Sequence, residues 1–180
     1  ALCIMLNEPE LAAESIKEGL EVSERFNLGP YLQPLALCDG WIRAFSGDVG
    51  AGLRRSEHAL AAIKAAPTAK YQLPMLTAFV GQIRMAAADI EGALTLLGEA
   101  LDLARANGEM YYVPEILRLT AEALLARPVP DGTRAEASLV EALEIARGQE
   151  AKFWELRAAL ALARLWSSQG RQSEAMTLVA

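Results

Sequence analysis

Apolar residues between positions 90 and 106 recur with the spacing of one face of an α-helix. They occupy positions i, i+1, i+4, i+7, i+8 and i+11, as Ala93, Leu94, Leu97, Ala100, Leu101 and Ala104. Asp89 stands just before this run, where its side chain can cap the first turn, and Gly108 follows, where glycine readily ends a helix. The pattern therefore predicts a helix over 90–107 with both ends defined.

The same helical pattern continues along the chain, with polar turns between its segments. Pro74 stands near the start of one segment, where its missing backbone N–H costs nothing. The strongest interruption is residues 128–132 (PVPDG), which predict a longer loop inside one repeat. We expect helices at about 1–6, 9–26, 33–46, 49–65, 72–87, 90–107, 113–126, 133–148, 153–168 and 171–180.

Pairs of small residues twelve positions apart indicate where neighbouring helices cross. The pairs are Gly40/Gly52, Gly81/Ala93, Ala123/Ala135 and Ala163/Ala175, and Ala12 adds a half-repeat before them. Their first members are 41, 42 and 40 residues apart, and a constant period of this kind is typical of a solenoid of stacked helix hairpins. We therefore predict an all-α array with a period of about 41 residues and roughly four and a half repeats, forming one domain over residues 1–180.

Two features distinguish the array from a perfect repeat. Ser56 stands where the following repeats have Leu97 and Leu139, so we expect the helix over 49–65 to be the least secure. The helical pattern also runs to both ends of the chain, and no starting Met precedes it. We therefore expect a fragment of a longer protein, with self-association through the truncated ends.

Composition narrows the function classes further. The net charge of −6 has both signs interspersed, which argues against nucleic-acid binding because that needs clustered Lys and Arg. No stretch approaches the ~20 apolar residues of a membrane span. Two cysteines, Cys3 and Cys38, are too few for a disulfide framework and are interpreted as buried thiols. These features predict a cytoplasmic protein without a membrane partner.

The small residues also carry a family resemblance. A helix–turn–helix unit with two small residues twelve apart and an Ala seven further on resembles the tetratricopeptide (TPR) pattern. It is present at Gly40/Gly52/Ala59, Gly81/Ala93/Ala100 and Ala123/Ala135/Ala142, and the first two positions recur at Ala163/Ala175. The chain departs from that pattern in its period, which exceeds 34 residues, and in its missing terminal prolines. Residues Arg43, Arg84, Ala126 and Trp166 occupy the place of the expected aromatic. The resemblance implies a right-handed TPR-like solenoid.

The last fifty residues resemble a more particular class of protein. Residues 141–147 (EALEIAR), 152–158 (KFWELRA) and 162–166 (LARLW) are similar to the C-terminal tail of large bacterial signalling proteins. Those regulators join a cyclase-like or DNA-binding domain to an ATPase core and a TPR-like region. The resemblance implies a regulatory or scaffolding segment and carries over no catalytic residue.

No motif of an enzyme or cofactor site occurs in the sequence. His58 is the only histidine and is interpreted as an exposed helix residue, since a lone His lacks a partnered base or metal set. Residues 47–52 (GDVGAG) are glycine-rich, but they lie between two helices and are interpreted as a tight turn. We therefore expect no enzymatic activity, no metal and no cofactor in this segment.

The TPR resemblance implies that the first helix of each hairpin lines a concave surface. The candidate protein-binding residues on that surface are Trp41, Gln82, Met85, Arg127 and Arg164. The alternative is that Trp41 packs in the core while the arginines only solvate the surface. Aromatic residues at the entry of each first helix, Tyr31, Tyr71, Tyr111, Tyr112, Phe153 and Trp154, similarly form either core wedges or a binding ladder.

These observations favour a non-catalytic interaction, scaffold or regulatory module that holds a protein, a peptide or another domain of its own chain. On that hypothesis, Trp41→Ala is expected to leave the melting temperature nearly unchanged and to abolish partner binding. The alternative is a small-ligand sensor that binds an effector between helices and controls a linked catalytic or DNA-binding domain.

Overall fold

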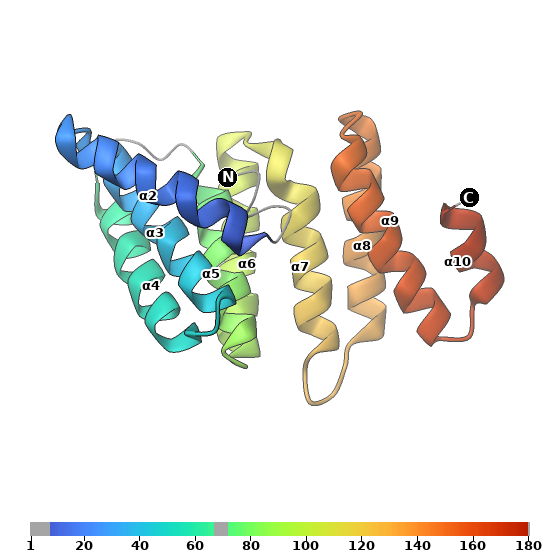
Figure 1. Cartoon of the computed structure of the whole chain (residues 1–180). Helices are drawn as coiled ribbons and strands as arrows, with labels where there is room; N and C mark the ends of the chain where they lie inside the picture. Colours follow the sequence, from blue (N-terminus) through green and yellow to red (C-terminus); the bar gives the residue numbers. More distant parts are fainter. Residues whose placement is uncertain (1–7, 67–71, 180) are drawn as a thin grey trace. The chain divides into compact units, whose positions relative to one another are not determined.

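The computed structural model describes residues 8–66 and 72–179, in which every extended regular element is an α-helix (Figure 1). The helices are α2 (Pro9–Arg25), α3 (Gly29–Phe45), α4 (Val49–Ala65), α5 (Leu73–Ala86), α6 (Ile90–Asn107), α7 (Val113–Leu125), α8 (Gly132–Gly148), α9 (Lys152–Ser168) and α10 (Gln172–Val179). A 3₁₀ turn, η1 (Met110–Tyr112), precedes α7. The all-α prediction is confirmed, while the expected helix over 1–6 lies outside the described residues.

One helix boundary differs clearly from its prediction. The helix expected over 33–46 begins at Gly29, with Pro30 in its first turn and Pro34 inside it. Proline is tolerated in a first turn because the N–H groups there have no helical partner. Both prolines suit a helix start, and the helix begins at the earlier one.

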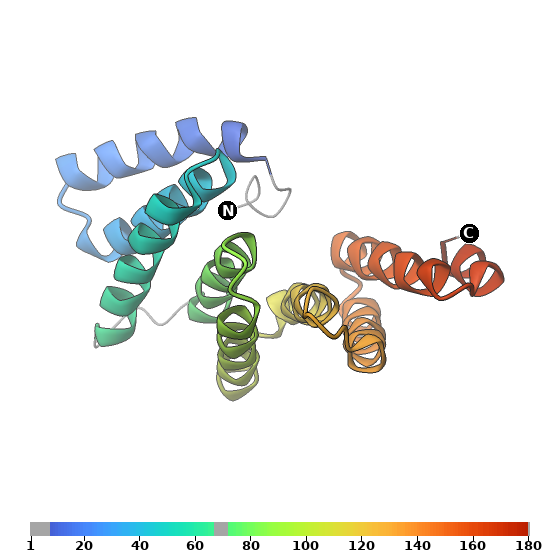
Figure 2. The same ribbon diagram turned by 90° about the horizontal axis from the view of Figure 1, so that it is seen from below.

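The chain divides into two compact units, Ala1–Leu96 and Leu97–Ala180, and the boundary falls within α6. In the first unit α3 packs against α2, α4 and α5, and α4 also contacts α5. In the second unit α8 packs against α7 and α9, and α9 also contacts α7 and α10. Figure 2 shows α7 and α8 nearly end-on and next to each other, as the two arms of a hairpin. The single domain over 1–180 stays a prediction.

The glycine pair Gly40/Gly52 marks the closest approach of α3 and α4. A Cβ atom added to Gly52 would lie 2.4 Å from the Gly40 carbonyl oxygen and 2.5 Å from the Ala44 backbone nitrogen. A Cβ added to Gly40 would lie 2.2 Å from the Ser56 hydroxyl and 2.8 Å from the Gly52 carbonyl oxygen. The crossing therefore has room for glycine alone at both positions.

Ser56 has a structural role that the sequence pattern did not indicate. Its buried hydroxyl donates a 3.0 Å hydrogen bond to the Leu37 carbonyl oxygen across the crossing. The expectation of an insecure helix was wrong, since α4 runs without interruption from Val49 to Ala65. Leucine at position 56 would not fit where the two backbones approach so closely.

The other small pairs are buried as predicted. Gly81, Ala93, Ala123 and Ala135 are inaccessible or nearly so, and Ala163 and Ala175 are also buried. Small side chains therefore occupy interior positions in each described repeat, as the solenoid prediction requires.

Three aspartates begin the second helices of successive hairpins. Asp48 accepts a hydrogen bond from the Ala51 N–H at 2.9 Å, and Asp131 accepts one from the Arg134 N–H at 3.0 Å. Asp89 accepts one from the Gly92 N–H at 3.0 Å, which confirms its predicted capping role. The tight turn expected within 47–52 is confined to the residues before α4, with Gly47 at a φ of +113°, and residues 49–52 already belong to α4.

Candidate interaction surface

Trp41 lies in the core and not on an open surface. Its side chain is completely buried, its ring stacks on Phe45 with centroids 4.4 Å apart, and its Nε1–H donates a 2.9 Å hydrogen bond to Gln82 Oε1. The structure thus brings two of the predicted residues together, as packing partners of α3 and α5. The expectation that Trp41→Ala leaves the melting temperature unchanged is wrong, because removing a buried Trp side chain costs about 3–5 kcal/mol.

The other predicted residues are more accessible. Met85 near the end of α5 is half-buried, and so is Arg127 just beyond α7. Arg164 on α9 is exposed, and its guanidinium has no ion pair or hydrogen bond to another described residue. Arg164 is therefore the predicted residue that is best placed to contact a partner.

Two of the four residues at the position of the TPR aromatic, Arg84 and Trp166, tie neighbouring hairpins together. Arg84 on α5 pairs with Glu57 on the preceding helix α4 and, at 2.5 Å, with Asp89. Trp166 on α9 donates a 2.7 Å hydrogen bond from Nε1 to Glu136 on the preceding helix α8. In both cases a polar group of a first helix binds the second helix of the hairpin before it.

An ion cluster centred on the buried side chains of Glu115 and Arg118 joins α7 and α9 and was missed at the sequence level. The carboxylate of Glu115 accepts two hydrogen bonds from Arg118, both 2.8 Å, and two from Arg157, at 2.8 and 3.0 Å. Arg118 also pairs with Glu122, which makes the cluster neutral. Glu115 and Arg157 are 42 residues apart, which is about one repeat. An acidic residue within an apolar run, with a basic residue one repeat later, was therefore the signal in the sequence that could have predicted this pair.

The aromatic residues at the helix entries divide between core and surface. Tyr112 and Trp154 are buried and meet edge to face at 5.3 Å, and burial together with Glu115 raises the pKa of Tyr112 well above its ordinary value. Tyr31, Tyr111 and Phe153 are exposed. Tyr71 lies outside the described residues. The core alternative is confirmed for Tyr112 and Trp154, and the binding ladder stays a prediction for the exposed aromatic residues.

The outer face of α9 presents an apolar stripe that ends at Arg164, a cation with no ion pair to another described residue. Phe153, Leu156 and Leu160 are 37%, 58% and 39% exposed, and Arg164 follows one turn later. Their positions, i, i+3, i+7 and i+11, fall on one helical face. We call these four residues the α9 stripe. The Glu155 carboxylate is not part of this stripe, because it is bound by Arg147 at 3.0 Å and by Lys152 at 2.8 Å.

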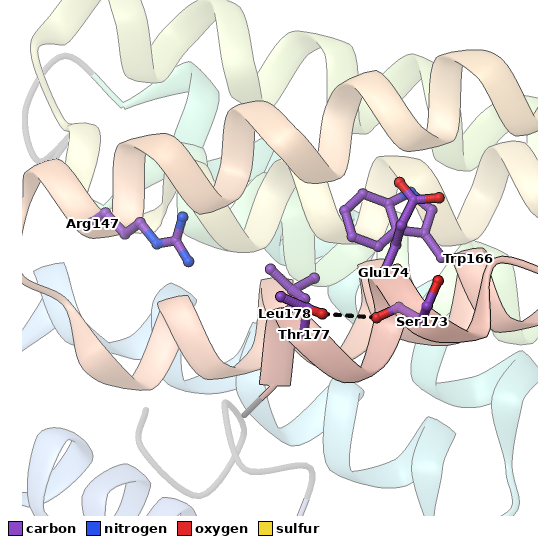
Figure 3. Close-up of a pocket in the computed structure, with 6 residues that line it drawn as sticks. All are labelled: Arg147, Trp166, Ser173, Glu174, Thr177 and Leu178. Atoms are coloured by element: carbon purple, nitrogen blue, oxygen red, sulfur yellow. Dashed lines mark hydrogen bonds between the residues drawn. The ribbon is translucent and has the colours of Figure 1, made fainter.

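A pocket of about 450 Å³ lies between the C-terminal helices (Figure 3). It is lined by Arg147, Trp166, Ser173, Glu174, Thr177 and Leu178. The charged groups of its wall are already engaged: Arg147 binds Glu155, and Glu174 binds Arg171 at 2.8 Å. The Thr177 hydroxyl donates to the Ser173 carbonyl oxygen at 2.9 Å, as the dashed line in Figure 3 marks.

Cys38 and His58 lie as the sequence interpretation has them. Cys38 is a free buried thiol, and burial raises its pKa from 9.0 to about 11. Cys3 lies outside the described residues. His58 is exposed. Within residues 8–66 and 72–179, no three His, Cys, Asp or Glu side chains come together as a metal site would require. No helix in these ranges is both long enough and apolar enough to cross a lipid bilayer.

Comparison with solved structures places the chain in the TPR-like fold class. It is similar to BtubC (BKLC) from P. vanneervenii, with a TM-score of 0.75 and 16% identity over 95% of this chain and 72% of that one. It is also similar to a putative kinesin light chain from Podosopora anserina with nearly identical TPR-like repeats. A form of that protein with one substitution gives a TM-score of 0.67, and another structure of it gives 0.65, each at 15% identity over 98% of this chain and 86% of the other.

Two further comparisons found no relative. No protein-family model matches the sequence, and no curated protein matches it. At 15–16% identity the structural similarity establishes the TPR-like all-α fold, which confirms the fold implied by the small-residue pattern.

Proposed function

We propose that this chain is a non-catalytic protein-interaction module and that the α9 stripe is its partner-binding surface. The observation that carries the proposal is the stripe itself: three large apolar side chains share one face of a helix with Arg164, which forms no ion pair with another described residue. Large apolar residues gathered on a surface are typical of protein-binding sites, and arginine is enriched among residues that dominate binding energy. The TPR-like fold supports the proposal, since helical solenoids use extended surfaces to bind partners.

We also propose the kind of parent protein to which this module belongs. The resemblance of residues 141–147, 152–158 and 162–166 to the tail of large bacterial regulators favours a scaffolding or regulatory segment of a cytoplasmic signalling protein. Its partner is then a protein or peptide, or another domain of the same parent chain. No enzymatic role is proposed, because the sequence contains no motif of an enzyme site.

Affinity capture from a lysate of the source organism tests the proposal with two matched variants. Leu156→Asp places a charge in the stripe, while Val129→Asp places the same charge on the α7–α8 loop, where Val129 is 81% exposed. We expect quantitative mass spectrometry to find a protein held by the parent and by V129D but lost by L156D. Identical captured proteins for all three forms would contradict the stripe as the binding surface.

A second candidate function is a small-ligand sensor, and the pocket between α8, α9 and α10 favours it. Its volume of about 450 Å³ lies within the range of small-molecule sites, and Trp166 offers an aromatic wall. A ligand at a hundredfold excess over its dissociation constant would stabilise the fold by ~2.7 kcal/mol. A thermal-shift screen of metabolites should then give a hit that Trp166→Ala removes, and a screen without hits would count against the sensor.

A further inference from the structure

We propose that the α9 stripe binds the outer face of α2 from a second copy of this chain. The inference rests on the proposed function, because it assigns an occupant to the same stripe. It is carried by two exposed helix faces that match in spacing and are opposite in charge.

The outer face of α2 consists of Leu11, Glu14, Glu18 and Val22, which we call the α2 face. All four side chains are exposed, and the two carboxylates form no ion pair with another described residue. Leu11 is 65% exposed and Val22 is 42% exposed, so apolar surface stands at both ends of the face. The inner face of the helix is occupied by Ala12, Ile16 and Ser23.

The two faces have the same periodicity. The α2 face and the α9 stripe both use positions i, i+3, i+7 and i+11 of a helix that is 17 residues long. Each face therefore extends over about 16 Å along its helix axis. Two helices with matched stripes can pack side chains between each other along that whole length.

The charges of the two helices are complementary. In α2, five glutamates against Lys17 and Arg25 give a net charge of −3. In α9, Lys152, Arg157 and Arg164 against Glu155 give a net charge of +2. Arg157 is held by Glu115, which leaves Arg164 as the stripe's own cation for a carboxylate of α2. Charge complementarity of this kind selects the partner and orients it.

Two different faces of each copy take part, so the contact is heterologous. Every copy bound through its α9 stripe still offers a free α2 face to a third copy. Association of this type continues beyond a dimer unless the rotation between copies closes a ring. The proposal therefore predicts a molecular mass that keeps rising with protein concentration and falls with added salt.

Sedimentation velocity on the 180-residue chain tests the proposal with two charge reversals, Arg164→Glu and Glu18→Arg. Each variant alone places like charges opposite each other, so we expect its association to weaken at least tenfold. An equal mixture of the two should associate again, because Glu18 of one variant meets Arg164 of the other. Both positions are exposed, and unchanged helical circular dichroism would verify the fold.

The outcomes separate this inference from the proposed function. A parent chain that stays monomeric at every concentration overturns the second-copy proposal, and so does association that neither charge reversal alters. If L156D nevertheless loses a captured partner that V129D retains, the stripe binds a different protein and the proposed function stands. Recovery of association in the mixture of charge variants supports both the second-copy proposal and the proposed function.

Discussion

Gly52→Ala tests whether the close crossing of α3 and α4 depends on the absence of a side chain at position 52. The new Cβ would lie 2.4 Å from the Gly40 carbonyl oxygen, 2.5 Å from the Ala44 nitrogen and 2.7 Å from the Ala44 Cβ. Neither backbone atom can rotate away, so α3 and α4 must separate by roughly 1 Å to restore an ordinary contact. Overpacking of this kind costs about 1–3 kcal/mol.

A second substitution, Gly98→Ala, is expected to change stability in the opposite direction and serves as the control. Gly98 lies inside α6, and an added Cβ there would meet no atom within 4 Å. Alanine is a better helix former than glycine by about 1 kcal/mol, so Gly98→Ala should stabilise the chain. Both substitutions reduce the conformational freedom of the unfolded chain in the same way. The difference between their effects on stability therefore reports contacts in the folded state.

The same helix-propensity gain offsets about 1 kcal/mol of the clash at position 52, which leaves a net loss of up to about 2 kcal/mol. For a chain of this size each kcal/mol shifts the melting temperature by about 2–4 °C. Thermal unfolding followed by circular dichroism should therefore show Gly52→Ala melting below the parent and Gly98→Ala above it. A Gly52→Ala variant as stable as Gly98→Ala would refute the close crossing of α3 and α4.

Three further predictions concern buried and paired side chains. Trp41→Ala should lower the free energy of unfolding by about 3–5 kcal/mol in urea titrations, and a loss below about 1 kcal/mol would contradict its burial. Glu115→Ala leaves Arg118 and Arg157 without their shared carboxylate and should cost a similar amount, about 3–5 kcal/mol, while unchanged stability would show that water compensates the arginines. Hydrogen bonds from Arg171 and Trp166 hold the pKa of Glu136 below its ordinary value of 4.5. The Glu136 carboxylate therefore contributes its full stabilisation above pH 4.5, and this stabilisation is lost as the pH falls through the lowered pKa. Urea titrations at several acidic pH values should therefore show a smaller acid-induced loss for Glu136→Gln than for the parent, and equal losses would contradict the pairing.

Much of the fold could be predicted because helical periodicity and small residues are local signals. The pattern between 90 and 106 predicted both ends of α6 as the structure has them. Gly40 and Gly52 marked a crossing at which a Cβ atom would strike backbone. The start of α3 was misplaced because Pro30 and Pro34 are both compatible with a first turn.

The candidate surface was harder to predict because exposure depends on which helices cover a face. Trp41 and Arg164 occupy matching places in the repeat, and α3 and α9 each contact three neighbouring helices. Trp41 is nevertheless buried, with its indole N–H bound to Gln82 of α5, whereas Arg164 is exposed. The Arg157 guanidinium could not be assigned to Glu115 without knowing how α7 and α9 pack. Leu156 was not singled out, since an apolar helix residue is more often buried than exposed.

Side-chain footprinting with a partner recovered by affinity capture tests the binding surface most directly. Hydroxyl-radical labelling of Phe153, Leu156 and Leu160 should fall when the partner is added at saturation, because binding removes these side chains from water. Labelling of Val129, which lies off the α9 stripe, should not change. Undiminished labelling of all three stripe residues, with protection elsewhere on the chain, would contradict the α9 stripe as the interaction surface.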